Sequence, residues 1–234
     1  MDIPLFILIT RSPNESLLKK LRSLVRAGVD AYIMCDEEPE VKSKRILHIP
    51  DSHMEEIGWT HHMSQKQNKI TAWDKATFYG YSSGRQYVWI CEDDVYWNTS
   101  SIVKELVNTT STADLIAYPI HESYEENPGW FHWDKVALLT KQKKYWTVTY
   151  NQFCRLSKRL LGRMAEVSRE RKRLFFHEGM FATLCNMYGY KIEYLKQDSL
   201  FINFYWGKSF TAEQVKQIIG EHKRVLLHPV KISV

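Results

Sequence analysis

Three consecutive carboxylates, Glu92, Asp93 and Asp94, directly follow the apolar run of residues 87–91. A short apolar run of this kind is typical of a strand buried on both faces. In open α/β sheets, ligands bind beyond the carboxyl ends of the strands. Adjacent carboxylates repel one another unless a cation neutralises them, and oxygen ligands suit Mg²⁺ or Mn²⁺. The alternative is a solvated acidic turn, but the position after such a strand favours a metal site.

The alternation of side chains along an extended segment divides these three residues. Glu92 and Asp94 are expected to point to one side and Asp93 to the other. The first and third acids are therefore the pair predicted to converge on a cation, provided that no turn intervenes.

The elements that must position these acids begin at the N-terminus. Residues 5–10 form a compact apolar run, and leucines at helical spacing follow the sequence Ser12-Pro13-Asn14-Glu15 as far as Gly28. A second apolar run covers residues 31–35, and a third, shorter strand is predicted at residues 45–49. This β-α-β order predicts a parallel sheet covered by helices.

Further helices and strands alternate along the rest of the chain, without an internal repeat or a linker. The pattern predicts a single α/β domain over residues 1–234. Residues 51–68 lack a clear period and are predicted to be a loop, while residues 121–144 are polar and aromatic, with a turn at Pro128-Gly129. Helices are predicted at residues 70–81, 101–107, 157–171, 180–188 and 212–219, and strands at residues 87–91, 115–118, 145–153 and 190–195.

The sequence Trp89-Ile90-Cys91-Glu92-Asp93-Asp94-Val95 resembles the Asp-x-Asp motif of GT-A glycosyltransferases. The resemblance implies a Rossmann-like, mixed and mainly parallel sheet flanked by helices. It also implies that residues 1–97 form a nucleotide-binding half and residues 98–234 an acceptor-binding half. It also implies that Asp94 binds a metal ion that bridges the donor diphosphate, with Glu92 supporting the metal or the ribose and Asp93 beside the donor. A glutamate at the first position departs from the motif and makes the role of Glu92 less defined.

The same resemblance extends to the donor nucleotide. In the family, the end of the first strand, an acid after the second strand and basic residues near the helix before the motif contact the donor. The matching residues are Thr10, Arg11, Asp36, Lys69, Asp74 and Lys75. Ordinary polarity at strand ends and on a helix surface would produce the same residues.

Many GT-A enzymes add a histidine near the C-terminus to the metal ligands, and His228 matches it in position. Lys231 would then approach the diphosphate as a point charge. The alternative is that His228 is a polar residue at the end of the apolar run 225–227.

A candidate base, in the sequence His177-Glu178-Gly179, directly precedes the helix predicted at residues 180–188. The backbone N–H groups and dipole of a helix N-terminus stabilise an ionised carboxylate, which is the form a general base needs. Inverting GT-A enzymes place an acid near this position, so the resemblance implies Glu178 as the base and His177 as a neighbour in the acceptor site. Glu178 is otherwise a helix-capping acid, and a retaining reaction stays open.

Aromatic residues supply a candidate wall for the acceptor or the donor sugar, because sugar rings stack on flat aromatic faces. Trp130, Trp133 and Asp134 lie in one such segment, and Trp206 lies in a second. Both segments could equally pack at the edge of the core.

Composition limits the classes of function. The 234 residues are 44% hydrophobic and 25% charged, and a net charge of +5 is too weak and dispersed to predict nucleic-acid binding. The 4 cysteines form no C-x-x-C pair, which excludes zinc ribbons and C-x-x-C redox sites and favours buried thiols. No signal peptide or membrane-spanning run is evident, so we expect a cytoplasmic protein or a domain excised from an anchored enzyme.

We therefore predict a Mn²⁺- or Mg²⁺-dependent glycosyltransferase that uses a nucleotide-sugar, by family habit a UDP-sugar, and a glycan or glycoprotein acceptor. A nucleotidyltransferase would normally carry a glycine-rich loop after the first strand, which residues 10–14 lack. A metal-dependent nuclease would need a basic groove that the sequence does not indicate. A non-catalytic carbohydrate-binding protein remains an alternative, although such modules are mostly all-β.

Overall fold

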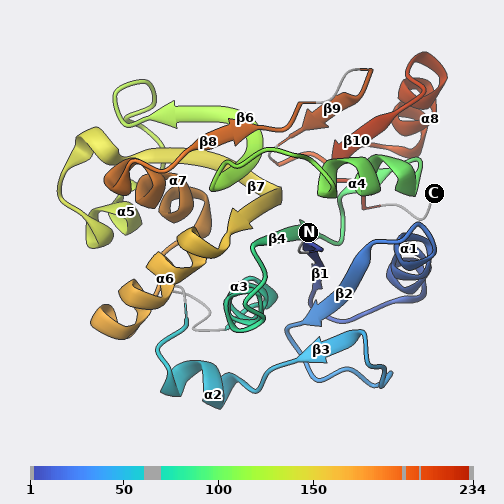
Figure 1. Ribbon diagram of the computed structural model, residues 1–234. Coiled ribbons are helices and arrows are strands. Elements are labelled where there is room, and N and C mark those ends of the chain that lie inside the picture. The colour runs from blue at the N-terminus through green and yellow to red at the C-terminus, as the bar shows by residue number, and fades with distance from the viewer. Residues whose placement is uncertain (1–2, 61–69, 197–198, 206, 232–234) are drawn as a thin grey trace.

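The computed structural model describes residues 3–60, 70–196, 199–205 and 207–231 (Figure 1). A central sheet of seven strands has the order β3-β2-β1-β4-β7-β6-β8. All pairs are parallel except those of β7, which runs antiparallel to both its neighbours. The predicted α/β class with a mixed, mainly parallel sheet is thus confirmed. The strands are β1 (Leu5–Thr10), β2 (Asp30–Cys35), β3 (Ile46–His48), β4 (Tyr87–Glu92), β6 (Leu115–Ser123), β7 (Thr147–Ser157) and β8 (Ile192–Tyr194).

Helices cover both faces of this sheet (Figure 1). On one face, α1 (Glu15–Arg26) and α4 (Ser100–Val107) pack against Phe6, Leu8 and Trp89. The other face carries α3 (Ala72–Ser82), α6 (Lys158–Arg171) and α7 (His177–Tyr188). Because side chains alternate along a strand, the central strands contribute apolar residues to both layers, as continuous apolar runs predict.

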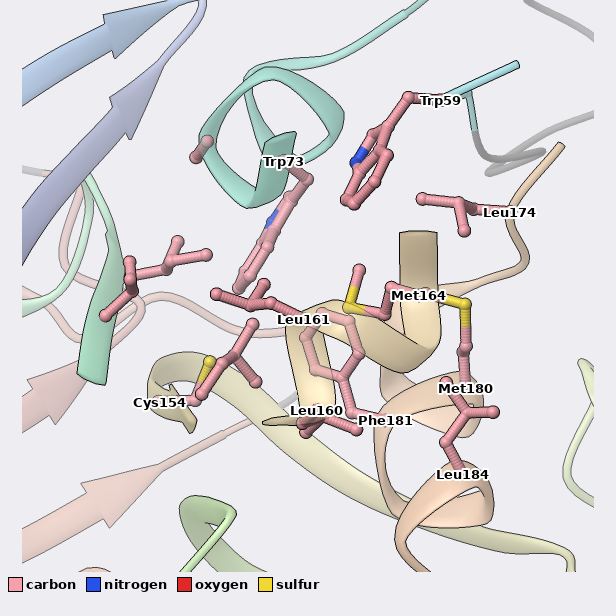
Figure 2. Close-up of a cluster of buried hydrophobic side chains, with 14 of the residues drawn as sticks. Trp59, Trp73, Cys154, Leu160, Leu161, Met164, Leu174, Met180, Phe181 and Leu184 are labelled. Atoms are coloured by element: carbon pink, nitrogen blue, oxygen red, sulfur yellow. The ribbon is translucent and has the colours of Figure 1, made fainter. Parts of the chain in front are cut away.

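Figure 2 shows the core beneath α3, α6 and α7. Trp73 from α3, Leu161 from α6 and Phe181 from α7 meet there, and each is buried. This layer fixes α3 and α7 relative to the end of β4, where the acidic residues lie.

Local signals explain where several helices begin and end. The side chain of Asn14 accepts a hydrogen bond from the backbone of Leu17 and caps α1, while Ser157 caps α6 through Leu160. Gly189 ends α7 with a φ of 64°, a left-handed conformation that glycine adopts without strain.

A second sheet of three strands, in the order β5-β10-β9, brings the C-terminal part of the chain to the acidic segment. Its strands are β5 (Tyr96–Trp97), β9 (Phe201–Phe204) and β10 (Val225–His228), and α8 (Ala212–Glu221) packs against it. β10 pairs with β5 directly after the acids, and the backbone N–H of Val230 donates to the carbonyl of Asp94 at 2.8 Å. His228 is thereby placed beside a segment more than a hundred residues away in the sequence.

Two segments for which no helix or strand is predicted, residues 51–68 and 121–144, contain regular structure. The first includes α2 (Asp51–Glu56), and the second includes the end of β6, α5 (Trp133–Leu139) and the 3₁₀ turn η1 (Lys143–Tyr145). α2 buries a single residue, Met54, so it lacks the apolar repeat that marks a helix. β5 and β9 also escaped the sequence analysis, because β5 has only two residues and β9 only four.

Within the part of the chain described, no helix combines the length and the apolar character needed to cross a membrane. All four cysteines are buried and free, as their sequence context predicts.

Candidate functional site

Glu92, Asp94 and His228 form a compact cluster at the carboxyl end of the central sheet. Nε2 of His228 lies 3.2 Å from Oε2 of Glu92 and 3.1 Å from Oδ1 of Asp94. One ligand atom from each of the three residues lies within 4.8 Å of the others. The first and third acids converge as predicted, but the cause differs from the predicted one. Asp93 and Asp94 lie in a turn closed by a hydrogen bond from the backbone N–H of Val95 to the carbonyl of Glu92, so alternation along an extended strand does not bring the two acids together.

Charge holds this cluster together. Burial disfavours the charged imidazole, but the carboxylates of Asp94 and Glu92 outweigh that effect and raise the pKa of His228 to about 9. Burial likewise opposes ionisation of Asp94, yet the hydrogen bond and charge of His228, together with Lys231, leave its pKa below the ordinary value. Apart from its contact with His228, Oδ1 of Asp94 has no hydrogen-bond partner among the described residues.

The donor set of the cluster suits a divalent metal ion. Two carboxylates and one imidazole are ligands that Mn²⁺, Mg²⁺ and Zn²⁺ take in proteins. Because two of the three ligands are carboxylates, the set favours the harder ions Mn²⁺ and Mg²⁺. A metal ion would replace the imidazolium proton as the positive charge between Glu92 and Asp94. The residues present therefore fit the predicted cofactor.

Trp73 contacts this cluster, although the sequence analysis did not identify it. Its indole N–H donates to Oε1 of Glu92 at 2.9 Å, and its ring stacks on His177 with centroids 4.2 Å apart. Trp73 precedes Asp74 and Lys75 in a segment already predicted to lie near the donor. Its apolar setting in the helix gave no separate signal.

Asp93 and Thr10 bind each other on the far side of the acidic segment. The hydroxyl of Thr10 donates to Oδ2 of Asp93 at 2.5 Å, and Lys20 donates to the carbonyls of Asp93 and Val95. Burial is the main cause that raises the pKa of Asp93, reinforced by the charges of Asp94 and Glu92. These contacts fix the turn after β4 to the end of β1.

Glu178 lies at the start of α7 and is 3% exposed. Nε2 of Gln152 donates to its Oε1 at 3.0 Å. Burial, followed by the charge of Glu92, raises the pKa of Glu178 to about 8, although Gln152 and His228 act in the opposite direction. The expectation that the helix N-terminus keeps this carboxyl ionised is therefore wrong, because desolvation outweighs the dipole. The charges of Glu92 and His228 nevertheless act on the pKa of Glu178, so this carboxyl lies within electrostatic range of the cluster.

The predicted donor residues after β2 and on α3 are engaged inside the protein. Asp36 accepts a hydrogen bond from the backbone N–H of Ala72, and Asp74 forms a capping box with Thr71. Lys75, which the sequence places on a helix surface, is instead fully buried, with its Nζ 2.8 Å from Asp51.

Arg11 differs from these residues because its side chain is 76% exposed, in an ion pair with Glu37. Lys69 and Trp206 lie outside the described residues, so their predicted contacts stay predictions.

The aromatic segment near α5 divides into a core part and an accessible part. Trp133 is 5% exposed and stacks on Trp146 in a small apolar cluster, which is a core position. Asp134 is exposed and pairs with Lys135. Trp130 is partly exposed and stacks on Phe176, directly before α7, so it lies nearer to Glu178 than its sequence position suggests.

A polar cavity of about 820 Å³ runs along α1 from the acidic segment. Asp93, Asp94 and Lys231 are among its lining residues, together with Thr99 and Ser100 at the start of α4. Lys231 and Asp94 thus line the same cavity, and the predicted contact of Lys231 with a diphosphate stays a prediction.

No protein-family model matches the sequence, and the curated proteins contain no significant match to it. The functional argument therefore depends on the geometry of these residues.

Proposed function

We propose that this protein is a metal-dependent glycosyltransferase of the GT-A type that moves a sugar from a nucleotide-diphospho-sugar to an acceptor hydroxyl. The observation that carries the proposal is the cluster of Glu92, Asp94 and His228, in which two acids after a central strand meet a histidine from the C-terminal region. The mixed, mainly parallel sheet agrees with the resemblance, and uridine diphosphate is the proposed carrier of the sugar.

In this proposal, Asp94, Glu92 and His228 bind Mn²⁺ or Mg²⁺, which stabilises negative charge on the departing diphosphate. Lys231, exposed beside Asp94, adds a positive charge on the same side. Thr10 and Arg11 at the end of β1 contribute to binding of the nucleoside.

Glu178 acts as the general base of a single displacement. It takes the proton of the acceptor hydroxyl while that oxygen bonds to the anomeric carbon and the bond from this carbon to the diphosphate breaks. A pKa of about 8 lies near the operating pH, where a base combines sufficient ionised form with sufficient basicity. Because Glu178 is 3% exposed, the side chains over it must move when the acceptor binds.

A metal-dependence test separates this proposal from its alternatives. Hydrolysis of a panel of nucleotide-sugars is measured with Mn²⁺, with Mg²⁺ and with EDTA. The melting temperature of the protein is recorded for each combination of nucleotide-sugar and additive, because a ligand specific for the folded state raises the melting temperature. We expect one nucleotide-sugar to be hydrolysed and to stabilise the protein only when metal is present.

Neighbouring aspartates supply a matched control. Asp94→Asn removes a predicted ligand, whereas Asp93→Asn changes an adjacent acid that contacts Thr10. Asp94→Asn should abolish metal-dependent binding, while Asp93→Asn should retain the metal. Equal Mn²⁺ affinities in wild type and Asp94→Asn would falsify the proposed site. Nucleotide binding with transfer of the nucleotidyl group would instead indicate a nucleotidyltransferase.

A further inference from the structure

Glu92 is held at both carboxylate oxygens by residues from different parts of the chain. Oε1 accepts the indole N–H of Trp73 at 2.9 Å, while Oε2 faces His228 at 3.2 Å. The side chain of Glu92 is 27% exposed, so burial alone does not fix its rotamer. Long carboxylate side chains lose considerable conformational freedom when they are ordered. The hydrogen bond from Trp73 therefore determines which oxygen is left for a cation.

The donor in this hydrogen bond is itself immobile. Trp73 is 7% exposed and belongs to the core under α3, α6 and α7. Its ring stacks on His177 at an interplanar angle of 18° and lies near Phe181, with Leu161 beside it in Figure 2. The hydrophobic core thus sets the position of the indole N–H, and that position is established as the chain folds.

We infer that Trp73 is a positioning residue for metal binding: its indole N–H holds Oε1 of Glu92 so that Oε2 faces the ion shared with Asp94 and His228. The inference rests on the proposed function and adds a residue that supports the ligands from outside. Trp73 touches neither the ion nor the substrate. Its stacking on His177 also joins the metal ligands to the first turn of α7, where Glu178 lies.

Groups that orient metal ligands from behind typically account for a 10- to 100-fold change in metal affinity. Replacement of Trp73 by phenylalanine removes the N–H but keeps an aromatic ring against His177. We therefore expect Trp73→Phe to weaken Mn²⁺ binding by about 10-fold or more.

Trp59 supplies the control for the loss of a buried indole. It is 3% exposed in the same core, appears beside Trp73 in Figure 2, and donates its indole N–H to Oγ1 of Thr77 at 3.0 Å. Trp59→Phe therefore removes one indole hydrogen bond and as many atoms from this core as Trp73→Phe does. The hydrogen bond that it removes goes to Thr77 and not to a metal ligand. It should lower the melting temperature as Trp73→Phe does and leave Mn²⁺ affinity unchanged.

The experiment measures Mn²⁺ binding to the whole chain by EPR, with no nucleotide and no acceptor, in wild type, Trp73→Phe, Trp59→Phe, Glu92→Ala and the double variant Trp73→Phe/Glu92→Ala. If Trp73 acts by positioning Glu92, Trp73→Phe should not lower the Mn²⁺ affinity further in the Glu92→Ala background. The inference would be overturned if Trp73→Phe lowered Mn²⁺ affinity equally in the wild-type and Glu92→Ala backgrounds. It would also be overturned if the Mn²⁺ affinity of Trp73→Phe lay within twofold of wild type, or if Trp59→Phe weakened Mn²⁺ binding as much as Trp73→Phe.

Failure of the inference is distinguishable from failure of the proposed function. If wild type binds Mn²⁺ and Asp94→Asn does not, the metal site stands whatever Trp73→Phe does. If wild type binds no Mn²⁺, both the site and the role of Trp73 fail together.

Discussion

Gln152 donates its side-chain N–H to Oε1 of Glu178 at 3.0 Å, and both residues are buried. The pair connects β7 to the first turn of α7. It partly offsets the cost of a carboxyl group in an apolar setting, but it does not remove that cost, because the pKa of Glu178 stays raised to about 8.

Glu178→Gln is predicted to stabilise the fold while it abolishes sugar transfer. In wild type, the folded state keeps a proton on Glu178 up to about pH 8, whereas the unfolded chain releases it near 4.5. The folded state therefore binds more protons between these values, and stability falls as the pH rises through that window. Glutamine keeps the shape and removes the titration.

Thermal denaturation in EDTA from pH 4 to pH 9 checks this prediction without a metal ion. The melting temperature of Glu178→Gln should exceed that of wild type by a margin that grows with pH and levels off above about pH 8. A constant difference across this range would show that Glu178 is not the group responsible.

Gly179 is predicted to be required for the contact between α5 and α7. A Cβ atom there would lie 2.4 Å from Cγ2 of Val136 and 3.3 Å from the ring of Trp130. Because the branched side chain of Val136 has little freedom, Gly179→Ala should destabilise the protein by about 1–3 kcal/mol through overpacking. Chemical denaturation measures the loss, and Val136→Ala in the Gly179→Ala background should recover part of it. If Val136→Ala does not restore stability in the Gly179→Ala background, the added Cβ atom does not clash with Val136.

Asp114 is predicted to support the fold in neutral solution and to lose this role in acid. Burial tends to raise its pKa, but hydrogen bonds from Arg159, Ser157 and the backbone of Lys191 prevail and lower it below 3.8. The group therefore contributes stability above its unfolded pKa, and that contribution is lost as the pH falls through the lower folded value.

Urea denaturation of Asp114→Asn should show a loss of about 2 kcal/mol at pH 7, because buried donors lose a charged partner. The difference in the free energy of unfolding between Asp114→Asn and wild type should become smaller below pH 4. Glu166→Gln alters a surface ion pair with Arg163 and should change stability by less than about 0.5 kcal/mol. A gap for Asp114→Asn that is independent of pH would contradict the assignment.

The sequence predicts the central sheet and the acids after β4 well, because both signals are local. The apolar run before Glu92 indicates a buried strand. Alternation predicts the right pair of acids, Glu92 and Asp94, but not the reason, because a turn at Asp93 and Asp94 brings them together. The meeting of Glu92 with Trp73 depends instead on how α3 packs over the sheet. No local pattern specifies that packing. The short strands β5 and β9 are similarly set by their partner β10.

The ionisation of Glu178 escaped the sequence analysis for a related reason. Its place at a helix N-terminus is visible in the sequence, but its burial beneath neighbouring elements is not. The same holds for Lys75, which has a polar side chain in a helix and yet is fully buried. Local patterns therefore identify the type of element, while solvation depends on contacts between distant segments.

Arg11 gives the most direct test of the predicted nucleoside contacts. Its side chain is 76% exposed and pairs only weakly with Glu37 in solvent, so its removal should not change the melting temperature. A contact with the donor would appear instead as weaker binding of uridine diphosphate in the presence of Mn²⁺. Calorimetric titration should show at least about a 5-fold loss of affinity for Arg11→Ala, as expected when a hydrogen bond to a charged group is lost. Arg22→Ala is the matched control, because Arg22 is 51% exposed and pairs with Glu15 within α1. Equal affinities in Arg11→Ala and Arg22→Ala would remove Arg11 from the donor site and leave Thr10 as the candidate at the end of β1.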